Sequence, residues 1–433
     1  MKLEDIYDIF LSHPVITTDT RDCPEGSIFF ALKGDNFDGN LFAHEALEKG
    51  CAHAVVDNPD VAGSDGRMIY VSNVLFMLQD LAYHHRSQLS LPIVQITGTN
   101  GKTTTKELVT AVLAEKFRVL STQGNLNNHI GVPKTLLRLT PDHQIAVIET
   151  GANHPGEIAD LSKIVDATSG LITNIGRAHL EGFGSFEGVV QTKLELYRHL
   201  AQSPDHYVFV NGDDELLMSH LQTPKTVTYG SPGKGFDIEG EVLQCNPCVV
   251  LRWRVNGSVW HEVTTHLVGS YNLNNMLAAA AVGIRYGVSE EQISHALAHY
   301  EPNNKRSQLQ TTEHNTLIVD AYNANPTSMK AAIDNFNQIE HPNKFLILGE
   351  MRELGASSDE AHAEVVAQLQ EYGFQNVWLV GEQFKASGRK AGYCCFDGLD
   401  DVSETLKKQP LKEYLILVKG SNGTRLHQLP AYL

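Results

Sequence analysis

The sequence has no long hydrophobic run. Its longest apolar stretches, such as residues 276–284, are rich in alanine and shorter than the about 18 residues that a membrane-spanning helix needs. The first residues, MKLEDIYDIFLSHP, mix acidic with apolar side chains and contain no continuous apolar segment, which is not typical of a signal peptide. We therefore expect no membrane segment and a location in the cytoplasm.

Cysteine is scarce. Six cysteines in 433 residues do not indicate a disulfide framework, and this number suits a reducing compartment. Cys245 and Cys248 form an isolated CxxC pair without a second pair to complete a zinc site. Two interpretations stay open for them, a metal or redox site and ordinary thiols beside a turn.

Positive charge is also in short supply. The chain has 34 Lys and Arg residues against 51 Asp and Glu residues, a formal net charge of -17. Such a surface repels phosphate backbones and anionic lipid. We expect no nucleic-acid partner, and an anionic ligand must be small enough for a few cations and backbone amides to hold it.

The remaining composition is that of a folded protein. Hydrophobic residues make up 42% and charged residues 20%, close to globular averages, and a length of 433 residues predicts three domains at about 150 residues each. From residue 92, apolar runs alternate with amphipathic stretches, which predicts βαβ units around a parallel sheet. These segments are PIVQIT, KELVTAVLAEKF, QIAVIET, GEIADLSKIV and SGLITNIG.

The pattern changes between residues 249 and 302. Two alternating runs flank Asn256-Gly257, which predicts a β-hairpin in a small inserted antiparallel piece. A helix is expected over residues 272–286, and Ser289 with Gln292 forms the capping box of the next helix. The polar stretch from Pro302 is the predicted domain boundary.

A fresh alternation of strands and helices follows that boundary, through NTLIVDAY, KFLILGEM, NVWLVGE and EYLILVKG. The first 85 residues have weaker periodicity, with GSIFFALKG and HAVVD as expected strands. We therefore predict an α/β protein of three domains. They are a small mixed α/β domain (1–85), a central P-loop domain with a parallel sheet (86–303) and a Rossmann-like C-terminal α/β domain (304–433).

One glycine loop points to phosphate binding. The expected strand 93–97 runs into Gly98-Thr99-Asn100-Gly101-Lys102-Thr103, and helix-forming residues follow at once. Glycines let backbone N–H groups point inward, and a helix N-terminus adds about half a positive charge. Lys102 would reach the β and γ phosphates, and the Thr103 hydroxyl would ligate Mg²⁺. The loop is shorter than GxxxxGK[ST], so the alternative is a glycine-rich turn.

Three later residues are weaker candidates. Glu149 ends the expected strand 145–150, at the edge where parallel sheets place ligands, and its carboxylate could hold Mg²⁺. His179 follows the expected strand 171–174, and Lys193 lies in the expected helix 186–200. Each has an ordinary alternative: a strand-end cap, a loop histidine and a solvated cation.

Several blocks in order resemble the Mur ligases over nearly the whole chain. The blocks are TDTRDCPEGSIFFALKGDNFDGNLF, TGTNGKTTTKE, GNLNNHIGVPKTLL, ETGANHPGEI, TNIGRAHLEGFGS, GSYNLNNMLAAAA, DAYNANPTSM, LGEMRELG and LVKGS. The short phosphate loop is the form that this family uses. The resemblance implies an ADP-forming amide ligase that adds D-alanyl-D-alanine to UDP-N-acetylmuramoyl-tripeptide through an acyl phosphate. Its product would serve bacterial cell-wall peptidoglycan synthesis.

The resemblance also implies roles for particular residues. It implies two Mg²⁺ ions at Thr103, Glu149, His179 and Lys193, with a CO₂-derived carbamate on Lys193, and catalytic roles for Lys102, His179, Lys193 and Arg306. The ATP contacts implied are Gly98, Thr99, Asn100, Gly101, Lys102, Thr103, Thr104, Asn272, Asn275, Arg306, Asp320, Tyr322 and Asn325. The contacts implied for the UDP-linked substrate are Thr20, Arg21, Phe37, Asp38, Gly39, Asn127, Asn128, Thr150 and Asn153. Packing amides at Asn272 and Asn275, and an exposed arginine in a turn at Arg21, are the alternatives.

Three residues depart from the family pattern. Tyr271 and Asn40 stand where histidine is usual, and Lys305 stands where glycine is usual. The competing functions are a ligase that adds the third stem residue, a folylpolyglutamate synthetase, and a non-catalytic scaffold that senses ATP. DAYNANPTSM and GEMRELG favour the dipeptide-adding enzyme. A scaffold is disfavoured by the retained Lys102, Thr103, Glu149, His179 and Lys193. We expect a monomer.

Overall fold

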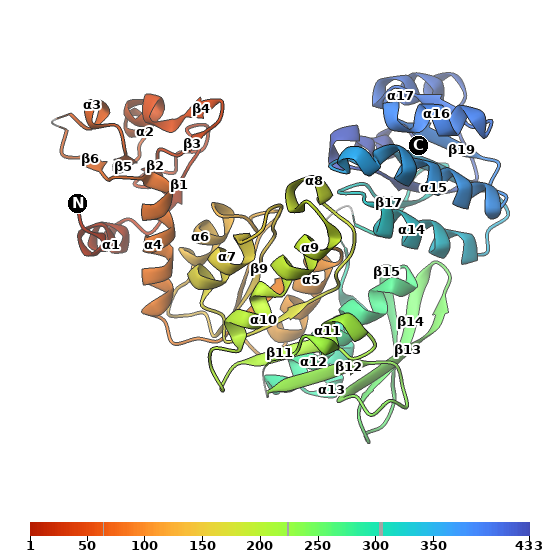
Figure 1. Ribbon diagram of the computed structural model, residues 1–433, viewed down its shortest axis with the longest axis horizontal. Coiled ribbons are helices and arrows are strands. Elements are labelled where there is room, and N and C mark those ends of the chain that lie inside the picture. Colours follow the sequence, from red (N-terminus) through yellow and green to blue (C-terminus); the bar gives the residue numbers. More distant parts are fainter. Residues whose placement is uncertain (64, 223–224, 303–305) are drawn as a thin grey trace.

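The computed structural model describes residues 1–63, 65–222, 225–302 and 306–433. Their helices and strands form three bodies in a row, with the N-terminal and C-terminal bodies at opposite ends of the central one (Figure 1). The predicted α/β fold with three domains is confirmed. Within the described residues, no helix is long and apolar enough to cross a membrane.

The N-terminal body is built on a parallel four-stranded sheet of order β1-β2-β5-β6. The two expected strands are present as β2 and β5, and all three residues of β2 are buried. The elements are α1 (Leu3–Ser12), β1 (Ile16–Thr17), β2 (Ile28–Phe30), β3 (Lys33–Gly34), β4 (Phe37–Asp38), η1 (Gly39–Phe42), α2 (Ala43–Glu48), β5 (His53–Val56), α3 (Pro59–Ala62), β6 (Met68–Tyr70) and α4 (Val74–Ser87).

Asn40 is a buried hub of this body. Its side chain is 1% exposed and donates to Asp38 Oδ1 (2.8 Å) and Asp57 Oδ1 (3.0 Å). Its carbonyl oxygen accepts from the backbone N–H groups of Asp57 and Asn58, both at 3.1 Å. This departure from the family pattern therefore joins the β3–β4 turn to the end of β5.

Replacing Asn40 with alanine should destabilise the N-terminal body. Two backbone donors and two carboxylate oxygens would lose a buried partner, and each unsatisfied buried group costs about 1–3 kcal/mol. We expect a clear fall of the first thermal unfolding transition, measured by calorimetry. Asn36→Ala is the matched control, because Asn36 is exposed in the same turn. Equal transitions in the two variants would contradict this role for Asn40.

The central body contains a nine-stranded sheet of order β15-β14-β13-β12-β11-β10-β7-β9-β8. The elements are β7 (Ile93–Thr97), α5 (Lys102–Ala114), β8 (Val119–Ser121), α6 (Gly131–Leu136), β9 (Ile145–Glu149), α7 (Glu157–Val165), β10 (Ser169–Ile172), α8 (Leu180–Phe183), α9 (Phe186–Lys193), α10 (Glu195–Leu200), β11 (Tyr207–Asn211), α11 (Glu215–Ser219), β12 (Thr226–Gly230), β13 (Ile238–Cys245), β14 (Cys248–Val255), β15 (His261–Val268), η2 (Ser270–Asn272), α12 (Leu273–Arg285) and α13 (Glu290–His299).

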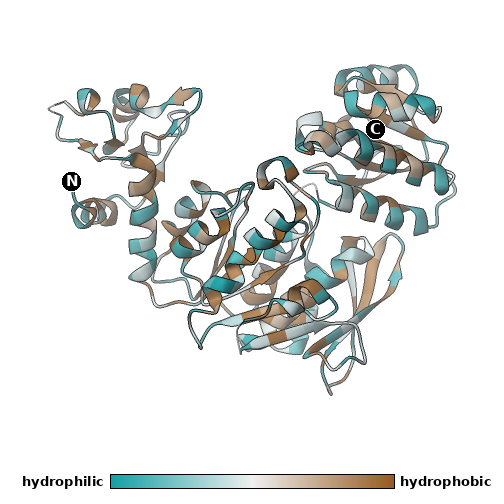
Figure 2. Cartoon of the chain, in the orientation of Figure 1, coloured by the Kyte–Doolittle hydropathy of each residue, from teal (hydrophilic) through white to brown (hydrophobic). Residues whose placement is uncertain are grey.

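Helices cover both faces of this sheet, so its parallel strands are buried and appear brown beneath amphipathic helices (Figure 2). One core packs α5 and α12 against the sheet, with Val112 and Leu277 fully or almost fully buried. The opposite core includes Leu161 of α7 and Leu196 of α10, and it continues through Leu78 of α4 into the N-terminal body. The helix α4 therefore fixes these two bodies to one another.

Three details of the central body differ from the sequence predictions. The hairpin at Asn256-Gly257 forms, but β13 pairs with β12, so the antiparallel strands extend the main sheet and are not a separate piece. The strand expected at 171–174 is β10, which begins and ends earlier, at Ser169 and Ile172. The side chains of Thr173 and Asn174, just beyond its end, donate to the Asn100 carbonyl. The helix expected at 186–200 is interrupted at Leu194.

Cys245 and Cys248 lie at the facing ends of β13 and β14, on either side of a turn. The Cys245 thiol lies 3.3 Å from Asn335 Oδ1 and 3.5 Å from Pro247 O. The structure therefore places this CxxC pair beside a turn, as one of the two interpretations expects.

The C-terminal body has a six-stranded sheet of order β16-β17-β21-β18-β19-β20, parallel except for β16. The elements are β16 (Gln308–Thr311), β17 (Thr316–Asp320), α14 (Pro326–Gln338), β18 (Lys344–Gly349), η3 (Gly355–Ser357), α15 (Ser358–Glu371), β19 (Val377–Val380), α16 (Glu382–Lys390), β20 (Cys394–Phe396), α17 (Leu399–Lys408), β21 (Leu415–Lys419), η4 (Asn422–Thr424) and η5 (Leu426–Ala431).

One predicted domain boundary falls inside a helix, and the other falls outside the described residues. Residue 85 lies near the end of α4, within the last turns of the helix that joins the first two bodies. Residues 303–305, which include the departure Lys305, lie outside the described residues. Both boundaries stay predictions.

Candidate active site

The phosphate loop connects β7 to α5. Gly98 has φ +143°, and a Cβ there would lie 2.0 Å from Thr173 Oγ1, so a side chain does not fit. Gly101, with φ +79°, is the N-cap of α5. The loop therefore brings the N-terminus of a 13-residue helix, with its unpaired N–H groups, to a cavity that Gly101 and Lys102 line.

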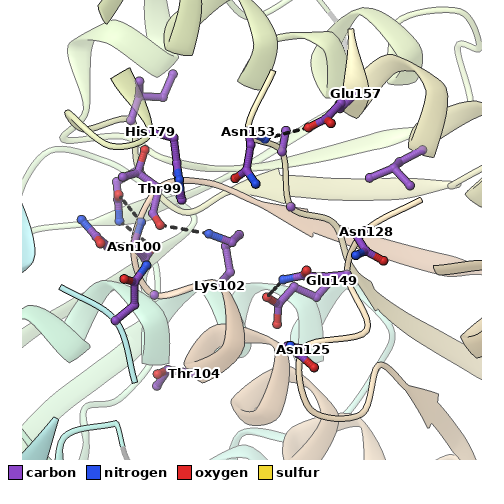
Figure 3. Close-up of a pocket in the computed structure, with 18 of the residues that line it drawn as sticks. Thr99, Asn100, Lys102, Thr104, Asn125, Asn128, Glu149, Asn153, Glu157 and His179 are labelled. Carbon is purple, nitrogen blue, oxygen red and sulfur yellow. Dashed lines mark hydrogen bonds between the residues drawn. The ribbon is translucent and has the colours of Figure 1, made fainter. Parts of the chain in front are cut away.

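Lys102 folds back onto this loop. Its ammonium donates to the carbonyls of Gly98 (2.9 Å) and Thr99 (3.0 Å), and Figure 3 draws the bond to Thr99. Burial lowers the pKa of Lys102 to about 8; nearby Glu149 opposes this shift and Arg306 adds to it. A cation whose charge is poorly solvated is favourable only beside an anion, which is what a phosphate would supply.

Glu149 ends β9 with one satisfied and one unsatisfied oxygen. The side chain is 1% exposed, and Oε1 accepts from Asn127 Nδ2 at 2.7 Å (Figure 3). Oε2 is buried without a hydrogen-bond partner among the described residues. A buried carboxylate oxygen without a partner is costly, and a bound cation would offset that cost.

His179 meets a carboxylate from the C-terminal body. It is the N-cap of α8 with φ +51°, and its Nδ1 contacts Glu353 Oε2. Burial lowers the pKa of His179, the positive charges of Lys102 and Lys193 add to this effect, and Glu353 opposes it. The lowered pKa favours the neutral imidazole, which is the form that binds metal ions.

Lys193 is a buried amine at the end of α9. It is 3% exposed and lies 5.7 Å from the centre of the Phe183 ring, with no hydrogen-bond partner in the described part of the chain. Burial and the charge of Lys102 lower the pKa of Lys193 to about 7, against the opposing effect of Glu157 and Glu195. Much of this side chain would therefore be neutral near pH 7.

The C-terminal body presents the carboxyl edge of its sheet. Asp320 ends β17 and Lys419 ends the neighbouring strand β21, where the two residues pair in register. Lys419 is 1% exposed, and its Nζ lies 2.5 Å from Asp320 Oδ2. Both line the cavity, at the edge where open α/β sheets bind ligands.

Asn325 links this body directly to the phosphate loop. Its Nδ2 donates to Asn100 Oδ1 at 2.7 Å, and Asn100 Nδ2 lies 3.5 Å from Asn325 Oδ1. The same Oδ1 accepts from the backbone N–H of Ser328 and so caps α14. Nearby, the Arg306 guanidinium lies 4.0 Å above the Tyr322 ring. The phosphate loop therefore touches the start of α14 through a pair of amides.

The predicted adenine contacts on η2 and α12 are already bonded to protein. Asn275 Nδ2 donates to Asn272 Oδ1 (2.8 Å), and Asn275 Oδ1 accepts from Thr105 Oγ1 (3.0 Å). Asn272 Nδ2 donates to the Val268 carbonyl at 2.9 Å. Both asparagines line the cavity. Through Thr105 they also connect α12 to α5, the helix that follows the phosphate loop.

Tyr271, a departure from the family pattern, connects two bodies. Its hydroxyl lies 2.7 Å from Ser307 Oγ, in the segment that leads to β16. Burial raises the pKa of Tyr271, so the hydroxyl stays protonated. This side chain is therefore a neutral hydrogen-bonding link beside the cavity.

These residues surround a cavity of about 1440 Å³ to which all three bodies contribute. The predicted site residues that line it are Thr99, Asn100, Gly101, Lys102, Thr104, Asn127, Asn128, Glu149, Asn153, His179, Asn272, Asn275, Arg306, Asp320, Tyr322 and Asn325. The structure thus brings together, around one cavity, predicted site residues from positions 99 to 325.

Other predicted residues do not line this cavity. Thr150 is fully buried, and its hydroxyl accepts from Gln95 Nε2 at 3.0 Å inside the sheet. Gly98, Thr103 in the first turn of α5, and Lys193 are also not among the lining residues, and the side chains of Thr103 and Lys193 are buried. The structure therefore does not offer the Thr150 side chain to a ligand.

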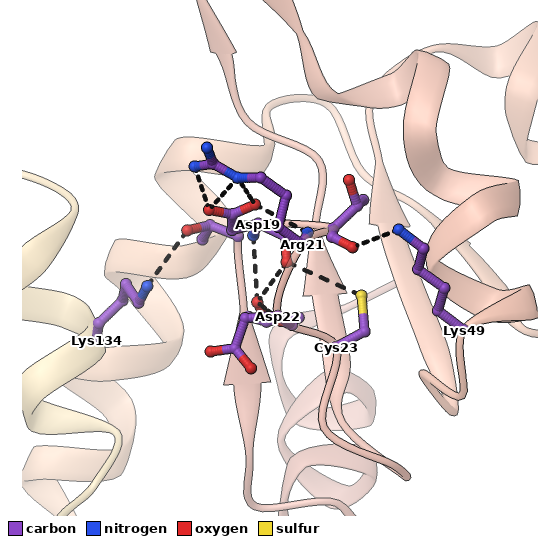
Figure 4. A network of polar contacts seen from close by, with 9 residues as sticks. Asp19, Arg21, Asp22, Cys23, Lys49 and Lys134 are labelled. Carbon is purple, nitrogen blue, oxygen red and sulfur yellow. Dashed lines mark hydrogen bonds and ion pairs between the residues drawn. The ribbon is translucent and has the colours of Figure 1, made fainter.

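The predicted uridine diphosphate contacts form a separate exposed cluster in the N-terminal body (Figure 4). The Arg21 side chain is 87% exposed and pairs with Asp19 at 2.6 Å, a contact that holds the pKa of Asp19 well below its usual range. Lys49 donates to the Thr20 carbonyl at 2.8 Å, and Lys134 of α6 reaches Thr18 Oγ1 at 3.3 Å. Cations from two bodies therefore gather around this loop.

The turn that follows is shaped by close packing. A Cβ at Gly39 would lie 2.6 Å from the Leu32 carbonyl, so this position requires glycine. Asp38 Oδ1 accepts from the Asn40 backbone N–H at 2.9 Å, and the half-exposed Phe37 ring stacks on Phe42 at 5.5 Å. Of these side chains, the Phe37 ring is the one most available to a ligand.

Sequence reasoning missed several lining residues. Phe76, Gln79, Asp80 and Tyr83 form one face of α4, with the spacing of a helix stripe that could have been found. Lys419 and Glu353 lie in blocks that were recognised without a role. Glu353 carries no local signal, because its contact with His179 depends on the fold.

The described residues fit a metal bound together with phosphates. They contain no group of three or more His, Cys, Asp or Glu side chains that could hold a metal alone. Mg²⁺ commonly binds one or two carboxylates together with substrate phosphates and water. The unpartnered Oε2 of Glu149, beside the phosphate loop, suits that mode.

Three family models match the chain. They are the Mur ligase family, catalytic domain (residues 14–86), the Mur ligase middle domain (96–283) and the Mur ligase, glutamate ligase domain (305–422). A UDP-N-acetylmuramoyl-tripeptide–D-alanyl-D-alanine ligase of Bacillus subtilis is 34% identical over 96% of this chain and 92% of that protein. The Escherichia coli enzyme of the same name is 36% identical, with the same coverage of both chains.

Solved structures give the same result. A crystal structure of MurF from Acinetobacter baumannii matches with a TM-score of 0.85 and 31% identity, over 96% of this chain and 92% of that one. MurF ligase from Thermotoga maritima in complex with ADP matches with a TM-score of 0.85 and 25% identity, over 100% and 98%. The similarity therefore extends over all three bodies.

Proposed function

The chain belongs to the Mur ligase family, and we propose that it joins D-alanyl-D-alanine to UDP-N-acetylmuramoyl-tripeptide, with ATP converted to ADP and phosphate. It is an ATP-dependent ligase that forms an amide bond, and its product serves peptidoglycan synthesis. The observation that carries the proposal is the shared cavity, which places the phosphate loop, Glu149 and the C-terminal sheet edge around one space.

The reaction needs activation because a carboxylate has no good leaving group. Transfer of the γ phosphate onto the tripeptide carboxylate gives an acyl phosphate, and the dipeptide amine then displaces phosphate. We assign Lys102 and Arg306 to neutralising charge during the transfer, since phosphoryl transfer depends mostly on positioning and electrostatics. The three bodies around the cavity would exclude water, which otherwise hydrolyses the acyl phosphate.

Thr103, Glu149, His179 and a carbamylated Lys193 would hold two Mg²⁺ ions, which supply positive charge to phosphate oxygens when bound. Only a neutral amine adds to CO₂, and it releases one proton as the carbamate forms. The lowered pKa of Lys193, about 7, supports this modification near neutral pH. Carbamate formation also converts the cationic side chain of Lys193 into an anion, which would attract the Mg²⁺ ions.

We place the adenosine part of ATP between the central and C-terminal bodies. Asp320 would bind the ribose, while Tyr322 and Asn325, with Asn272 and Asn275 across the cavity, would surround the adenine. Their positions on the cavity wall support this arrangement. Asn128 and Asn153, on the side of the cavity nearer α4, would contact the muramoyl peptide.

We assign the exposed cluster around Arg21, together with Thr20 and the turn Phe37-Asp38-Gly39, to the uridine diphosphate end of the substrate. Arg21 and Lys134 supply the cations that a diphosphate needs. We also place the enzyme in the cytoplasm, where the six free cysteines of the chain would stay reduced. A monomer stays our expectation.

Arg21→Ala should weaken binding of the UDP-linked substrate. Loss of a charge-assisted contact to phosphate costs about 1.5–3 kcal/mol, so we expect the KM for this substrate to rise by roughly ten- to a hundredfold. The KM for ATP should hardly change, because Arg21 does not line the nucleotide cavity. Arg67→Ala is the control, since Arg67 pairs with Asp65 in the same manner elsewhere in the N-terminal body. An equal rise for ATP would refute the assignment.

Phosphate release by the purified enzyme tests the function itself. The full mixture contains ATP, Mg²⁺, UDP-N-acetylmuramoyl-tripeptide and D-alanyl-D-alanine, and each component is omitted in turn. We expect release only with all four. Turnover with a folate and glutamate, or with a single amino acid in place of the dipeptide, would identify a different ligase, and no turnover in any mixture would favour a scaffold.

A further inference from the structure

The Asn127 amide lies against Glu149, and we propose that Asn127 is a positioning residue that holds one oxygen of this carboxylate and leaves the other for Mg²⁺. This inference rests on the proposed function, because it concerns the metal of that reaction. It gives Asn127 a role through Glu149, in place of the direct contact to the muramoyl peptide that the resemblance implies.

The two oxygens of Glu149 are in different states. Asn127 Nδ2 donates to Oε1 at 2.7 Å, whereas Oε2 is buried and has no hydrogen-bond partner among the described residues. The backbone N–H of Glu149 donates to Thr122 Oγ1 at 2.9 Å, which fixes the end of β9. The amide therefore determines which oxygen remains available and how the carboxylate plane is turned.

The backbone holds the Asn127 side chain in this place. The Gly151 N–H donates to the Asn127 carbonyl at 2.8 Å, and the Asn127 N–H donates to the Asn125 carbonyl at 2.8 Å. A Cβ at Gly151 would lie 3.2 Å from the Asn127 amide, so glycine leaves room for it against the strand end. The loop before α6 thus holds this amide against Glu149.

An amide suits this position for a chemical reason. It donates a hydrogen bond without a formal charge, so Glu149 keeps the full negative charge that attracts a divalent cation. A lysine or arginine at the same place would neutralise the carboxylate and compete with the metal. Residues that orient metal ligands in this way commonly change metal affinity by about 10–100-fold when they are removed.

The test measures metal affinity directly. Mn²⁺ replaces Mg²⁺, and its free signal is followed by electron paramagnetic resonance with enzyme and a non-hydrolysable ATP analogue, without tripeptide or dipeptide. We expect Asn127→Ala to weaken Mn²⁺ binding by about tenfold or more. Asn125→Ala is the matched control: Asn125 lies in the same loop and lines the cavity, and its side chain does not bond to Glu149. Its Mn²⁺ affinity should equal that of the wild type.

A double-mutant cycle separates action through Glu149 from independent action. In a Glu149→Gln background, Asn127→Ala should cause little further loss of Mn²⁺ affinity, because the carboxylate that it orients is gone. Thermal unfolding without ligands establishes that each variant is folded. A normal Mn²⁺ affinity in Asn127→Ala, with a raised KM for UDP-N-acetylmuramoyl-tripeptide, would overturn the proposal and make Asn127 a substrate contact. Fully additive losses of Mn²⁺ affinity from Asn127→Ala and Glu149→Gln would also overturn it.

This outcome is separate from that of the proposed function. The Mn²⁺ measurement uses only metal and nucleotide, so it stands whichever acid and amine the enzyme joins. Failure of the dipeptide to support turnover would refute the assigned reaction, while the Mn²⁺ affinities of the Asn127→Ala and Asn125→Ala variants would still decide the role of Asn127.

Discussion

Lys102→Ala should reduce ATP-dependent phosphate release by about a hundred- to a thousandfold, the usual cost of removing one preorganised charge from a transition state. The wild-type ammonium is bonded to its own loop carbonyls, 2.9 and 3.0 Å away, beside the cavity. It is thus poised to exchange those partners for phosphate oxygens. Release of phosphate in the complete reaction mixture is the measurement, and near-normal release would place the nucleotide elsewhere.

The fold should survive this change, because the hydrogen bonds of the Lys102 ammonium to the described residues go to carbonyls of its own loop. Lys330→Ala is the control for activity, since Lys330 is an exposed lysine of α14 paired with Asp334. Thermal unfolding gives a second check. The folded pKa of Lys102, about 8, is below its ordinary 10.5, so the unfolded state binds more protons between these values. Stability of the free enzyme should therefore rise with pH across this window, and less so in Lys102→Ala.

Lys193→Ala should also lose most activity, by about a hundredfold or more, if the residue serves as a carbamate. A bare ammonium beside two Mg²⁺ ions would be repelled, so only the charge-reversed form fits the proposed site. Lys193→Arg should fail as badly, although it keeps the formal charge, because guanidinium does not form a stable carbamate. Initial rates with saturating substrates give the comparison.

Two further measurements test the modification itself. Short carboxylic acids should restore part of the activity of Lys193→Ala by occupying the vacated anionic position, and should do nothing for Lys193→Arg, where no space is left. Labelled bicarbonate should give a carbamate signal in the carbon NMR spectrum of the wild type that both variants lack. Full activity in Lys193→Arg would return Lys193 to an ordinary buried cation.

The sequence predicted the local parts of this protein well. The strand over 93–97 is β7 as expected, because a buried apolar run and the glycines after it are signals within a few residues. The capping box of Ser289 and Gln292 forms for the same reason. The hairpin at Asn256-Gly257 was also predicted from local signals. The strand to which the antiparallel segment attaches could not be predicted, because every strand edge offers the same backbone N–H and C=O groups.

The side-chain pairs of the site could not be predicted in this way. Asn127 meets Glu149 across 22 residues, Asp320 meets Lys419 across 99 residues, and Asn100 meets Asn325 across 225 residues. These pairs depend on how the bodies and their strands are placed, and periodicity has no information about that. The resemblance gathered most of these residues into one site, yet it did not reveal which of them hold one another.

The amide pair of Asn100 and Asn325 couples ligand binding at the phosphate loop to the attachment of α14 to that loop. A ligand that needs either amide must first break their mutual hydrogen bonds, so its affinity is reduced by the stability of the pair. By reciprocity, that ligand weakens the attachment of α14 to the phosphate loop by the same factor. If the nucleotide needs either amide, as we propose, its affinity and the attachment of the C-terminal body are coupled, and a change at either asparagine should shift both.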